Sequence, residues 1–349
     1  MSFFQKNKRS SIKRFAIKNT SAIILVILFL VLVFIDSSLF SVRNIRNIIS
    51  IGAPRLIVAC AFAFCMYAGF LDLSLVFSAG FAGIIVASFF QTGNSAHILF
   101  SSTMSIPFFF ILIIAILLVS LAGVLNAVLI RKFSFPFYLA NLGTITVLYG
   151  LAHIYLHRPE QGEIFLDGFS KAFTNFGTGA IGSDPTYSFP ISVILSVCIC
   201  VGIWFVSKRS QLCKKILKNG SCSSSDKNLS FNELLLLFCS ATVISSLGGV
   251  MQVSYVGFVD AEFGLSFLFD IMAICLLSGF SVFGCKGKFP VLIAGTIIYT
   301  ASCYAVDFVG LGRFTAYIIR ALVIIVNIGL DIHFRNPKVK ENLEKKDIM

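Results

Sequence analysis

One carboxylate, Asp72, lies inside an otherwise apolar part of the sequence, in the stretch GFLDLSLVFSAG at residues 69–80. The surrounding residues 51–90 are almost all apolar. An ionisable group in such a segment is costly to place in lipid, so it indicates an ion or substrate path, a proton relay or a structural role at a helix end. A second acid, Asp270, has a similar setting in SFLFDIMAICLLSG.

Other polar residues also interrupt the apolar segments. Ser74 lies two residues after Asp72. Interhelical hydrogen bonds explain a further group at least as well as substrate contacts do, and its members are Asn126, Asn141, Thr144, Tyr149 and Asn327. The basic residue Arg320 falls within an apolar segment too, and we expect it to pair with an acid such as Asp307 or to extend toward the membrane surface.

The sequence lacks motifs for enzymatic chemistry. A phosphate-binding loop needs G-x-x-x-x-G-K-S/T, and the nearest approach, from Gly279 to Gly284, continues with Cys285 and Lys286. The ten cysteines include no C-x-x-C pair and the four histidines are scattered, so neither a disulfide framework nor a metal site is predicted. We expect no enzyme activity, no metal and no cofactor, and any ATP that drives this protein must be bound by another subunit.

The composition is that of a membrane protein. Of the 349 residues, 57% are hydrophobic and 13% are charged, and the mean hydropathy is +0.91, which is too apolar for a soluble chain. A transmembrane helix needs roughly 20 apolar residues. Ten segments qualify, at about 21–40, 51–70, 73–91, 106–130, 137–156, 188–206, 232–251, 268–284, 288–306 and 314–333. The predicted fold class is an all-α polytopic membrane protein with about ten transmembrane helices.

The distribution of basic residues predicts the topology. Lys and Arg gather before residue 20 and between alternate spans, at 131–132, 208–227 and 286–288, and again in the tail from Arg335. Such residues concentrate in cytoplasmic loops, so ten spans with both termini in the cytoplasm fit the pattern. Few basic residues fall on the predicted outer side: Arg43, Arg46, Arg55, Arg158, Lys171 and Arg313. Topology therefore explains the net charge of +12, and nucleic-acid binding is not predicted.

The membrane pattern divides the chain into a basic cytoplasmic segment at 1–20, a transmembrane domain at 21–333 and a basic cytoplasmic tail at 334–349. Two longer loops interrupt the transmembrane domain, an outer one at about 157–187 and an inner one at about 207–231. Loops of this length in a compact domain are usually functional or disordered.

The two acids indicate an internal repeat. If spans two to five and seven to ten are two halves of opposite orientation, Asp72 and Asp270 occupy corresponding positions. At this position Gly69 would end one helix and Asp72 would cap the next, where a carboxylate suits the free N–H groups. We expect this structural role for Asp72. A part in gating is compatible with it, because the cap would lie at an inner turn between spans.

Four stretches resemble the membrane permeases of ABC importers for ribose, galactose and related sugars. The first is GFLDLS, which is similar to the family's G-G-x-D-L-S, and the second is GVLNAVLIRKFSFPFYLANLGTITVLYG at 123–150, which is similar to its G-x-x-N-G…P-F-x-x-x-L-G-T block. The third is FDIMAICLLSGFSVFG, which resembles L-D-A-I-A-A-V-V-L-G-G, and the fourth is IIRALVIIVNIGLD, which resembles the closing segment. The likeness runs from about Asn44 to Asp331.

This resemblance implies two permease subunits around one path, two cytoplasmic ATPase subunits beneath them and a substrate-binding protein on the outer face of a bacterial inner membrane. The candidates for the translocation path or for helix caps are Asp72, Ser74, Asn126, Asn141, Thr144 and Asp270. The inner loop would contact the ATPase, and its candidates are Lys214, Lys215, Ser224, Ser225, Asp226 and Lys227. The family has an N-P-E-A-A-K-like helix there, whereas this chain has CSSSDK at 222–227, so the helix is predicted to be shortened, moved toward 211–217 or adapted to a divergent ATPase.

The expected substrate is a sugar of the galactose, glucose or ribose class. Related permeases import nucleosides or riboflavin-like molecules, and the spans alone do not discriminate because selection lies mostly with the binding protein. An ion-coupled secondary carrier is the alternative from another class. It needs an acid that faces a cavity at mid-depth, and the predicted position of Asp72 at an inner turn argues against it.

Overall fold

The structure is a computed structural model that describes residues 23, 26, 27, 30, 33, 34 and 36–335, apart from 93, 94, 96, 101–106, 160, 161, 183–187, 212, 216–228, 283, 285 and 311–312. Nearly all regular structure in the described residues is helical, which confirms the predicted all-α class. The basic segment 1–20 lies outside the described residues, as do most of the first predicted span and most of the tail.

Within the described residues, one helix follows each predicted span from the second to the tenth. These helices are α3 Val42–Tyr67, α4 Ser74–Phe89, α5 Phe108–Arg131, α6 Phe137–Leu156, α8 Ile191–Arg209, α10 Phe231–Val256, α11 Phe263–Leu277, α12 Phe289–Phe308 and α13 Arg313–Arg335. Six of them are long and apolar enough to cross a membrane: α3, α5, α6, α8, α10 and α12. The apolar helices α4 and α11 are shorter. The main boundary differences are that α3 begins well before residue 51 and that α11 ends at Leu277 rather than near 284.

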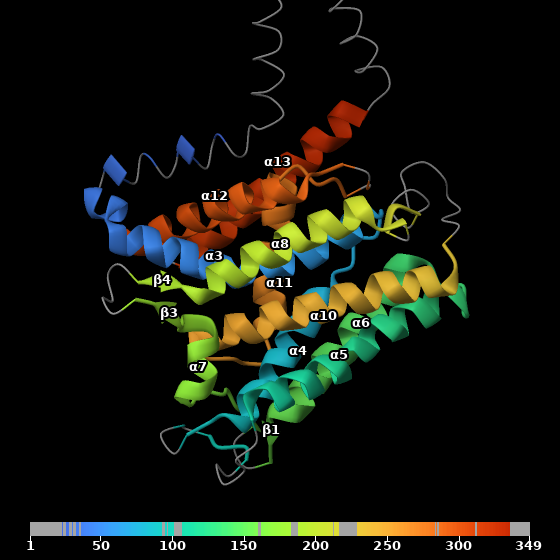
Figure 1. The fold of residues 1–349 in the computed structure, drawn as a ribbon, viewed down its shortest axis with the longest axis horizontal. Coiled ribbons are helices and arrows are strands. Elements are labelled where there is room, and N and C mark those ends of the chain that lie inside the picture. Colours follow the sequence, from blue (N-terminus) through green and yellow to red (C-terminus); the bar gives the residue numbers. More distant parts are fainter. Residues whose placement is uncertain are drawn as a thin grey trace, which may run out of the picture.

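Helix α10 lies in the middle of the bundle and packs against α3, α4 and α5 (Figure 1). Glycines permit this close approach, as small residues commonly do between membrane helices. A Cβ atom on Gly249 would lie 2.1 Å from the carbonyl oxygen of Ala79 in α4, and one on Gly248 would lie 2.6 Å from Val58 in α3. Because these glycines have no side chain, α3, α4 and α5 can all pack closely against α10.

Gly123→Ala in α5 is expected to destabilise the protein by about 1–3 kcal/mol, because the added carbon would lie 2.8 Å from the backbone of Phe238 in α10. The matched control is Gly143→Ala in α6, where no heavy atom lies within 4 Å of the added carbon. Helix propensity alone makes that control neutral or slightly stabilising. Thermal unfolding in detergent compares the two variants, and equal losses would contradict the tight packing of α5 on α10.

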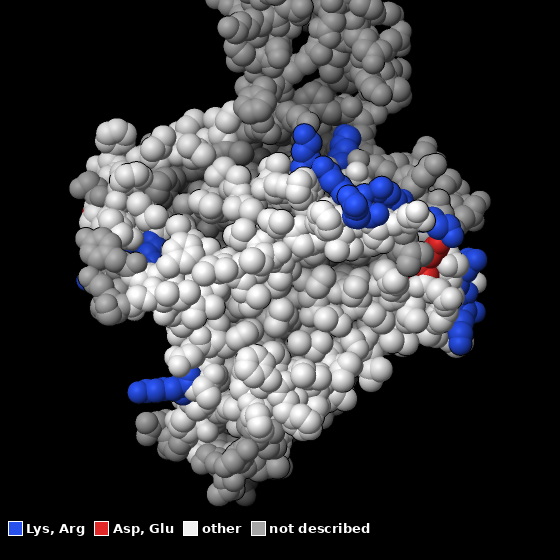
Figure 2. All heavy atoms as spheres, viewed as in Figure 1, with Lys and Arg blue, Asp and Glu red and all other residues white. Residues whose placement is uncertain are grey.

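The two ends of the bundle differ in structure and charge. One end carries a short helix and two hairpins (Figure 1), which are α7 Lys171–Thr178, β1 His157–Arg158 with β2 Gly162–Glu163, and β3 Ala180–Ile181 with β4 Phe189–Pro190. We call it the hairpin end, and it contains the predicted outer loop. At the opposite end, α5 and α8 finish with Arg131, Lys208 and Arg209, and basic side chains gather there (Figure 2). We call it the basic end.

The helix pairs α3–α4 and α10–α11 repeat each other with opposite directions, since α3 runs toward the basic end and α10 toward the hairpin end (Figure 1). Helices α3 and α10 both have 26 residues, and α4 and α11 have 16 and 15. A left-handed glycine follows each long helix, Gly69 with φ 83° and Gly257 with φ 74°, and the next residues are FLD and FVD. The counterpart of Asp72 is therefore Asp260.

The predicted equivalence of Asp72 and Asp270 is wrong. Asp270 lies in the middle of α11, whereas Asp72 and Asp260 precede their short helices. Hydropathy placed the start of this span near residue 268 because Asp260, Glu262 and Ser266 interrupt the apolar run before it, whereas α11 begins at Phe263.

Candidate functional site

Five of the predicted site residues meet near the basic end, where the α3–α4 connection contacts α5 and α6. We call them the Asp72 cluster: Asp72, Ser74, Asn126, Asn141 and Thr144. Each is at most 3% exposed. Sequence reasoning named every member but gave no sign that residues from three separate segments would form one group.

Asp72 begins the cluster because it lies just before α4. Its Oδ1 atom accepts hydrogen bonds from the Ser74 backbone N–H at 3.1 Å and from the Ser74 hydroxyl at 2.6 Å. The first N–H groups of a helix have no partner within the helix, and a carboxylate suits the positive end of the helix dipole. The chain therefore turns just before α4, and the Asp72 carboxylate accepts hydrogen bonds from Ser74, the first residue of that helix.

Two asparagines join this helix start to α5 and α6. Asn126 of α5 donates from Nδ2 to Ser74 Oγ at 3.0 Å and to Asp72 Oδ2 at 3.5 Å. Asn141 of α6 accepts from the Ser74 N–H at 3.1 Å and donates to the Leu71 carbonyl at 2.9 Å. Thr144 donates to Asn126 Oδ1 at 2.6 Å. Because these polar groups are bonded to one another, the cluster can hold three helices in register.

A second cluster surrounds Asp270, the sixth predicted site residue. We call it the Asp270 cluster, and it consists of Arg55 of α3, Asp270 of α11, Tyr299 of α12 and Arg320 of α13. Asp270 Oδ2 lies 3.2 Å from a terminal nitrogen of Arg55, and Oδ1 lies 2.7 Å from Arg320 Nε. The Tyr299 hydroxyl donates to Oδ1 at 2.6 Å.

The Asp270 cluster bears on two predictions. Arg320 pairs with an acid, as predicted, but the acid is Asp270 rather than Asp307, because α11 and α13 lie side by side. Arg55 was assigned to the outer side, but it lies in the middle of α3 and reaches the same carboxylate. Sequence reasoning also missed Tyr299. The available signal was Arg55 itself, since an arginine within an apolar helix requires an acidic partner.

One carboxylate faces two guanidinium groups in this cluster, so the net formal charge of the cluster is positive. The Asp270 side chain is 4% exposed, and those of Arg55 and Arg320 are 15% and 16% exposed. Charges at this depth are stable only when they are paired or face a water-filled cavity. The pairing ties α11, α12 and α13 to α3, and it leaves both guanidinium groups partly accessible.

The predicted ATPase-contact residues are only partly described. Lys214 and Lys215 are exposed near the basic end, and Lys215 Nζ lies 2.7 Å from Glu233 Oε1. Glu233 forms a capping box with Ser230 at the start of α10. The remaining candidates lie outside the described residues: Ser224, Ser225, Asp226 and Lys227. Asn327 donates to the carbonyl of Val323 one turn earlier in α13.

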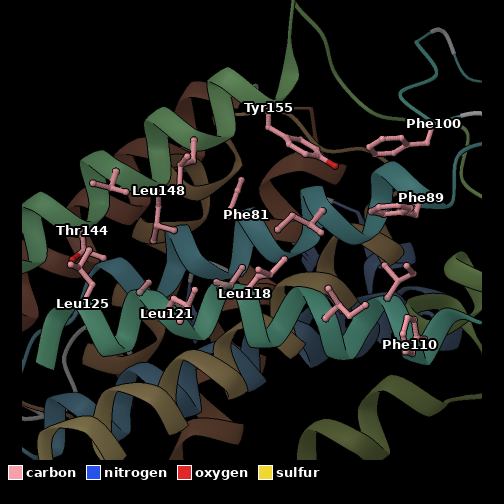
Figure 3. A pocket seen from close by; sticks show the side chains of 17 residues that line it. Phe81, Phe89, Phe100, Phe110, Leu118, Leu121, Leu125, Thr144, Leu148 and Tyr155 are labelled. Atoms are coloured by element: carbon pink, nitrogen blue, oxygen red, sulfur yellow. The ribbon is translucent and has the colours of Figure 1, made fainter. Parts of the chain in front are cut away.

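A groove of about 910 Å³ lies between α4, α5 and α6 (Figure 3). Its lining is aliphatic and aromatic except for the side-chain oxygens of Thr144 and Tyr155. Thr144 belongs to the Asp72 cluster, and the Tyr155 hydroxyl is 2.8 Å from that of Ser88. Such a surface suits lipid chains better than a polar solute. Among the described residues, no group of three His, Cys, Asp or Glu side chains could hold a metal ion.

Comparisons with known proteins identify permeases as relatives. The chain is 24% identical to the galactose/methyl galactoside import permease protein MglC of Escherichia coli K12, over 88% of this chain and 92% of that relative. It is 25% identical to the ribose import permease protein RbsC of Haemophilus influenzae, over 96% and 99%, and 24% identical to the D-allose transport system permease protein AlsC of Escherichia coli K12, over 74% of each.

No solved structure matches the chain. A family model does match it, over residues 44–328, which include both clusters and all helices from α4 to α12. Since this match covers most of the sequence, the chain belongs to the family described as branched-chain amino acid transport system / permease component.

Proposed function

We propose that this chain is the permease subunit of an ABC importer for a sugar of the galactose, glucose or ribose class. The observation that carries the proposal is similarity over nearly the full length to permeases whose names specify galactose and ribose import. An extracytoplasmic binding protein would deliver the sugar, and a separate ATPase would supply the energy. The permease itself would bind no nucleotide.

The proposed orientation places the basic end in the cytoplasm and the hairpin end outside a bacterial inner membrane, with both termini cytoplasmic. Its support is the concentration of Arg131, Lys208, Arg209 and the adjacent loop lysines at one end (Figure 2), since cytoplasmic loops carry an excess of Lys and Arg. In this orientation, the loop at 207–231 meets the ATPase and the hairpins meet the binding protein.

The two clusters give the proposed permease its rigid parts. The Asp72 cluster fixes the short helix α4 to α5 and α6, and the Asp270 cluster fixes the short helix α11 to α3, α12 and α13. A second permease subunit, identical or different, would complete the path. Binding of ATP would then move these rigid parts relative to each other, because packed and hydrogen-bonded helices move as bodies rather than deform.

Co-purification from native membranes in mild detergent tests the function. We expect an ATPase and a binding protein to be recovered with this chain, and we expect the complex in proteoliposomes to take up D-galactose or D-ribose only with ATP and the binding protein. Nucleosides and riboflavin serve as competing substrates. Uptake of a nucleoside but of no sugar would contradict the substrate class. Recovery of the chain alone, with uptake driven by an ion gradient, would contradict the importer.

A further inference from the structure

A third polar group, at the hairpin end, has no role in the two clusters above. We call it the hairpin-end cluster: Tyr149 and His153 of α6, Glu163 of β2, and Glu262 just before α11. The Tyr149 hydroxyl donates to Glu262 Oε1 at 2.7 Å. His153 Nδ1 lies 2.5 Å from Glu163 Oε1, and its Nε2 lies 4.0 Å from Glu262 Oε1. The ring centroids of Tyr149 and His153 are 4.2 Å apart.

Part of this cluster lies at membrane depth. Tyr149 precedes the end of α6, at Leu156, by seven residues, which is about 10 Å along the helix axis. Because Glu262 bonds to Tyr149, the start of α11 lies at that depth too. The side chains of Glu262 and Glu163 are nevertheless 53% and 57% exposed. Exposed carboxylates are unstable against hydrocarbon, so this flank of α6 borders water or another protein chain.

The opposite flank of α6 has the reverse character. It faces the apolar groove shared with α4 and α5 (Figure 3), where the Thr144 and Tyr155 oxygens are already engaged with Asn126 and Ser88. Helix α6 therefore has an apolar groove on one side and, near the hairpin end, a flank with exposed carboxylates on the other. A solute that crosses the permease would meet the flank that carries Tyr149 and His153.

Packing holds the Tyr149 ring in place. Phe77 of α4 contacts it edge to face, with the ring centroids 6.3 Å apart. Phe77 is itself fixed by the close approach of α11, since a Cβ atom on Gly264 would lie 2.9 Å from the Phe77 ring. A ring that is oriented before a ligand arrives costs little conformational entropy when the ligand binds.

We propose that the hairpin-end cluster is a contact site for a neutral, hydroxyl-rich ring that enters the permease, a proposal that rests on the import function above. Carboxylate oxygens accept hydrogen bonds from hydroxyl groups, and Glu163 and Glu262 remain more than half exposed. The flat faces of Tyr149 and His153 suit the C–H face of such a ring, as in other ligand sites that combine aromatic walls with a few polar groups. The two carboxylates repel anionic solutes.

Uptake by the complete importer in proteoliposomes tests the site, with D-galactose and its monodeoxy analogues as probes. Glu262→Leu is expected to lower the maximal uptake rate for galactose about tenfold or more, because a charge-assisted hydrogen bond is lost. Glu262→Gln should lose less, since its amide oxygen still accepts. For the analogue that lacks the contacted hydroxyl, the three proteins should differ less than twofold.

Tyr149→Phe is expected to lower galactose uptake as well, because the Tyr149 hydroxyl that holds Glu262 in position is lost. Its matched control is Tyr155→Phe in the same helix, which loses a hydroxyl contact on the apolar flank and should change uptake less than twofold. Melting temperatures identify variants that fold poorly, and Glu262→Gln, which keeps the size of the side chain, carries the test if Glu262→Leu misfolds.

Three results would overturn the proposal. The same loss for galactose and for every deoxy analogue would assign the cluster a purely structural role. Equal losses in Glu262→Gln and Glu262→Leu, together with a dependence of wild-type uptake on a particular cation, would make it a cation site. An intact wild-type importer that takes up no hydroxyl-rich solute would contradict the import function itself and this site with it, which separates the two kinds of failure.

Discussion

Asp270→Leu is expected to destabilise the protein by about 3–5 kcal/mol, because it leaves two largely buried guanidinium groups without their counter-charge. Arg55 and Arg320 both depend on this carboxylate, and Tyr299 would lose its acceptor at 2.6 Å. Asp270→Asn keeps an acceptor for Tyr299 but removes the charge, so we expect this variant to lose most of the stability that Asp270→Leu loses. The measurement is thermal unfolding of the purified protein in detergent.

The control is a triple variant that removes all three charges, Arg55→Met, Asp270→Leu and Arg320→Met. Replacement of a complete buried ion network by apolar residues is often neutral or stabilising, so the triple variant should regain most of the stability lost in Asp270→Leu. A triple variant as unstable as Asp270→Leu would show that packing rather than charge is responsible. A stable triple variant that no longer transports would assign the charges a function in the path.

Asp72→Ala is expected to cost about 2–4 kcal/mol of stability, since three donors in this buried network each lose one acceptor, although Asn141 still accepts from the Ser74 N–H and Ser74 Oγ from Asn126. They are the Ser74 backbone N–H, the Ser74 hydroxyl and the Asn126 amide. Asp72→Asn keeps one carbonyl oxygen that can accept from Ser74, so it should cost about 1 kcal/mol and leave ATP-driven uptake intact. Thermal unfolding and uptake by the reconstituted importer measure the two effects.

Asp36→Ala is the matched control for Asp72→Ala. The Asp36 carboxylate also accepts a backbone N–H two residues ahead, from Ser38 at 2.9 Å, at the start of the short 3-10 helix η1 Ser37–Phe40, but in an exposed setting. Its loss should cost much less stability than the loss of Asp72, because water can replace the exposed carboxylate as an acceptor. Equal effects at the two positions would contradict the importance of burial.

An Asp72→Asn protein that keeps exchange but loses only proton dependence would instead favour an ion-coupled carrier.

The two buried clusters show how the inverted helix pairs have diverged. Each short helix is held by an acid, but Asp72 lies before α4 whereas Asp270 lies within α11. Asp260, the true counterpart of Asp72, lies beside Glu262 and the hairpin-end cluster. The turn of the α3–α4 pair thus belongs to a hydrogen-bond network near the basic end. The turn of the α10–α11 pair lies at the opposite end, next to the proposed solute contact.

The sequence by itself determined the class of the protein and the positions of most of its helices. Runs of about 20 apolar residues are set by the thickness of the hydrocarbon layer, so the helices from α3 to α13, apart from the short α7, coincide with predicted spans. The isolated polar residues in those runs were recognisable for the same reason. Asp72, Asn126 and Asn141 are conspicuous because each is costly in lipid without a partner.

Only the tertiary structure decided which of these residues are partners. A hydrogen-bond partner in a membrane bundle is chosen by how helices pack, and the sequence carries no distance between Asp72 and Asn126 or between Arg55 and Asp270. Hydropathy also started the α11 span about five residues late, because Asp260, Glu262 and Ser266 interrupt the apolar run, and this placed Asp270 at the apparent helix start. That error paired Asp72 with Asp270 and concealed Asp260, and it was resolved by the left-handed glycines that end α3 and α10.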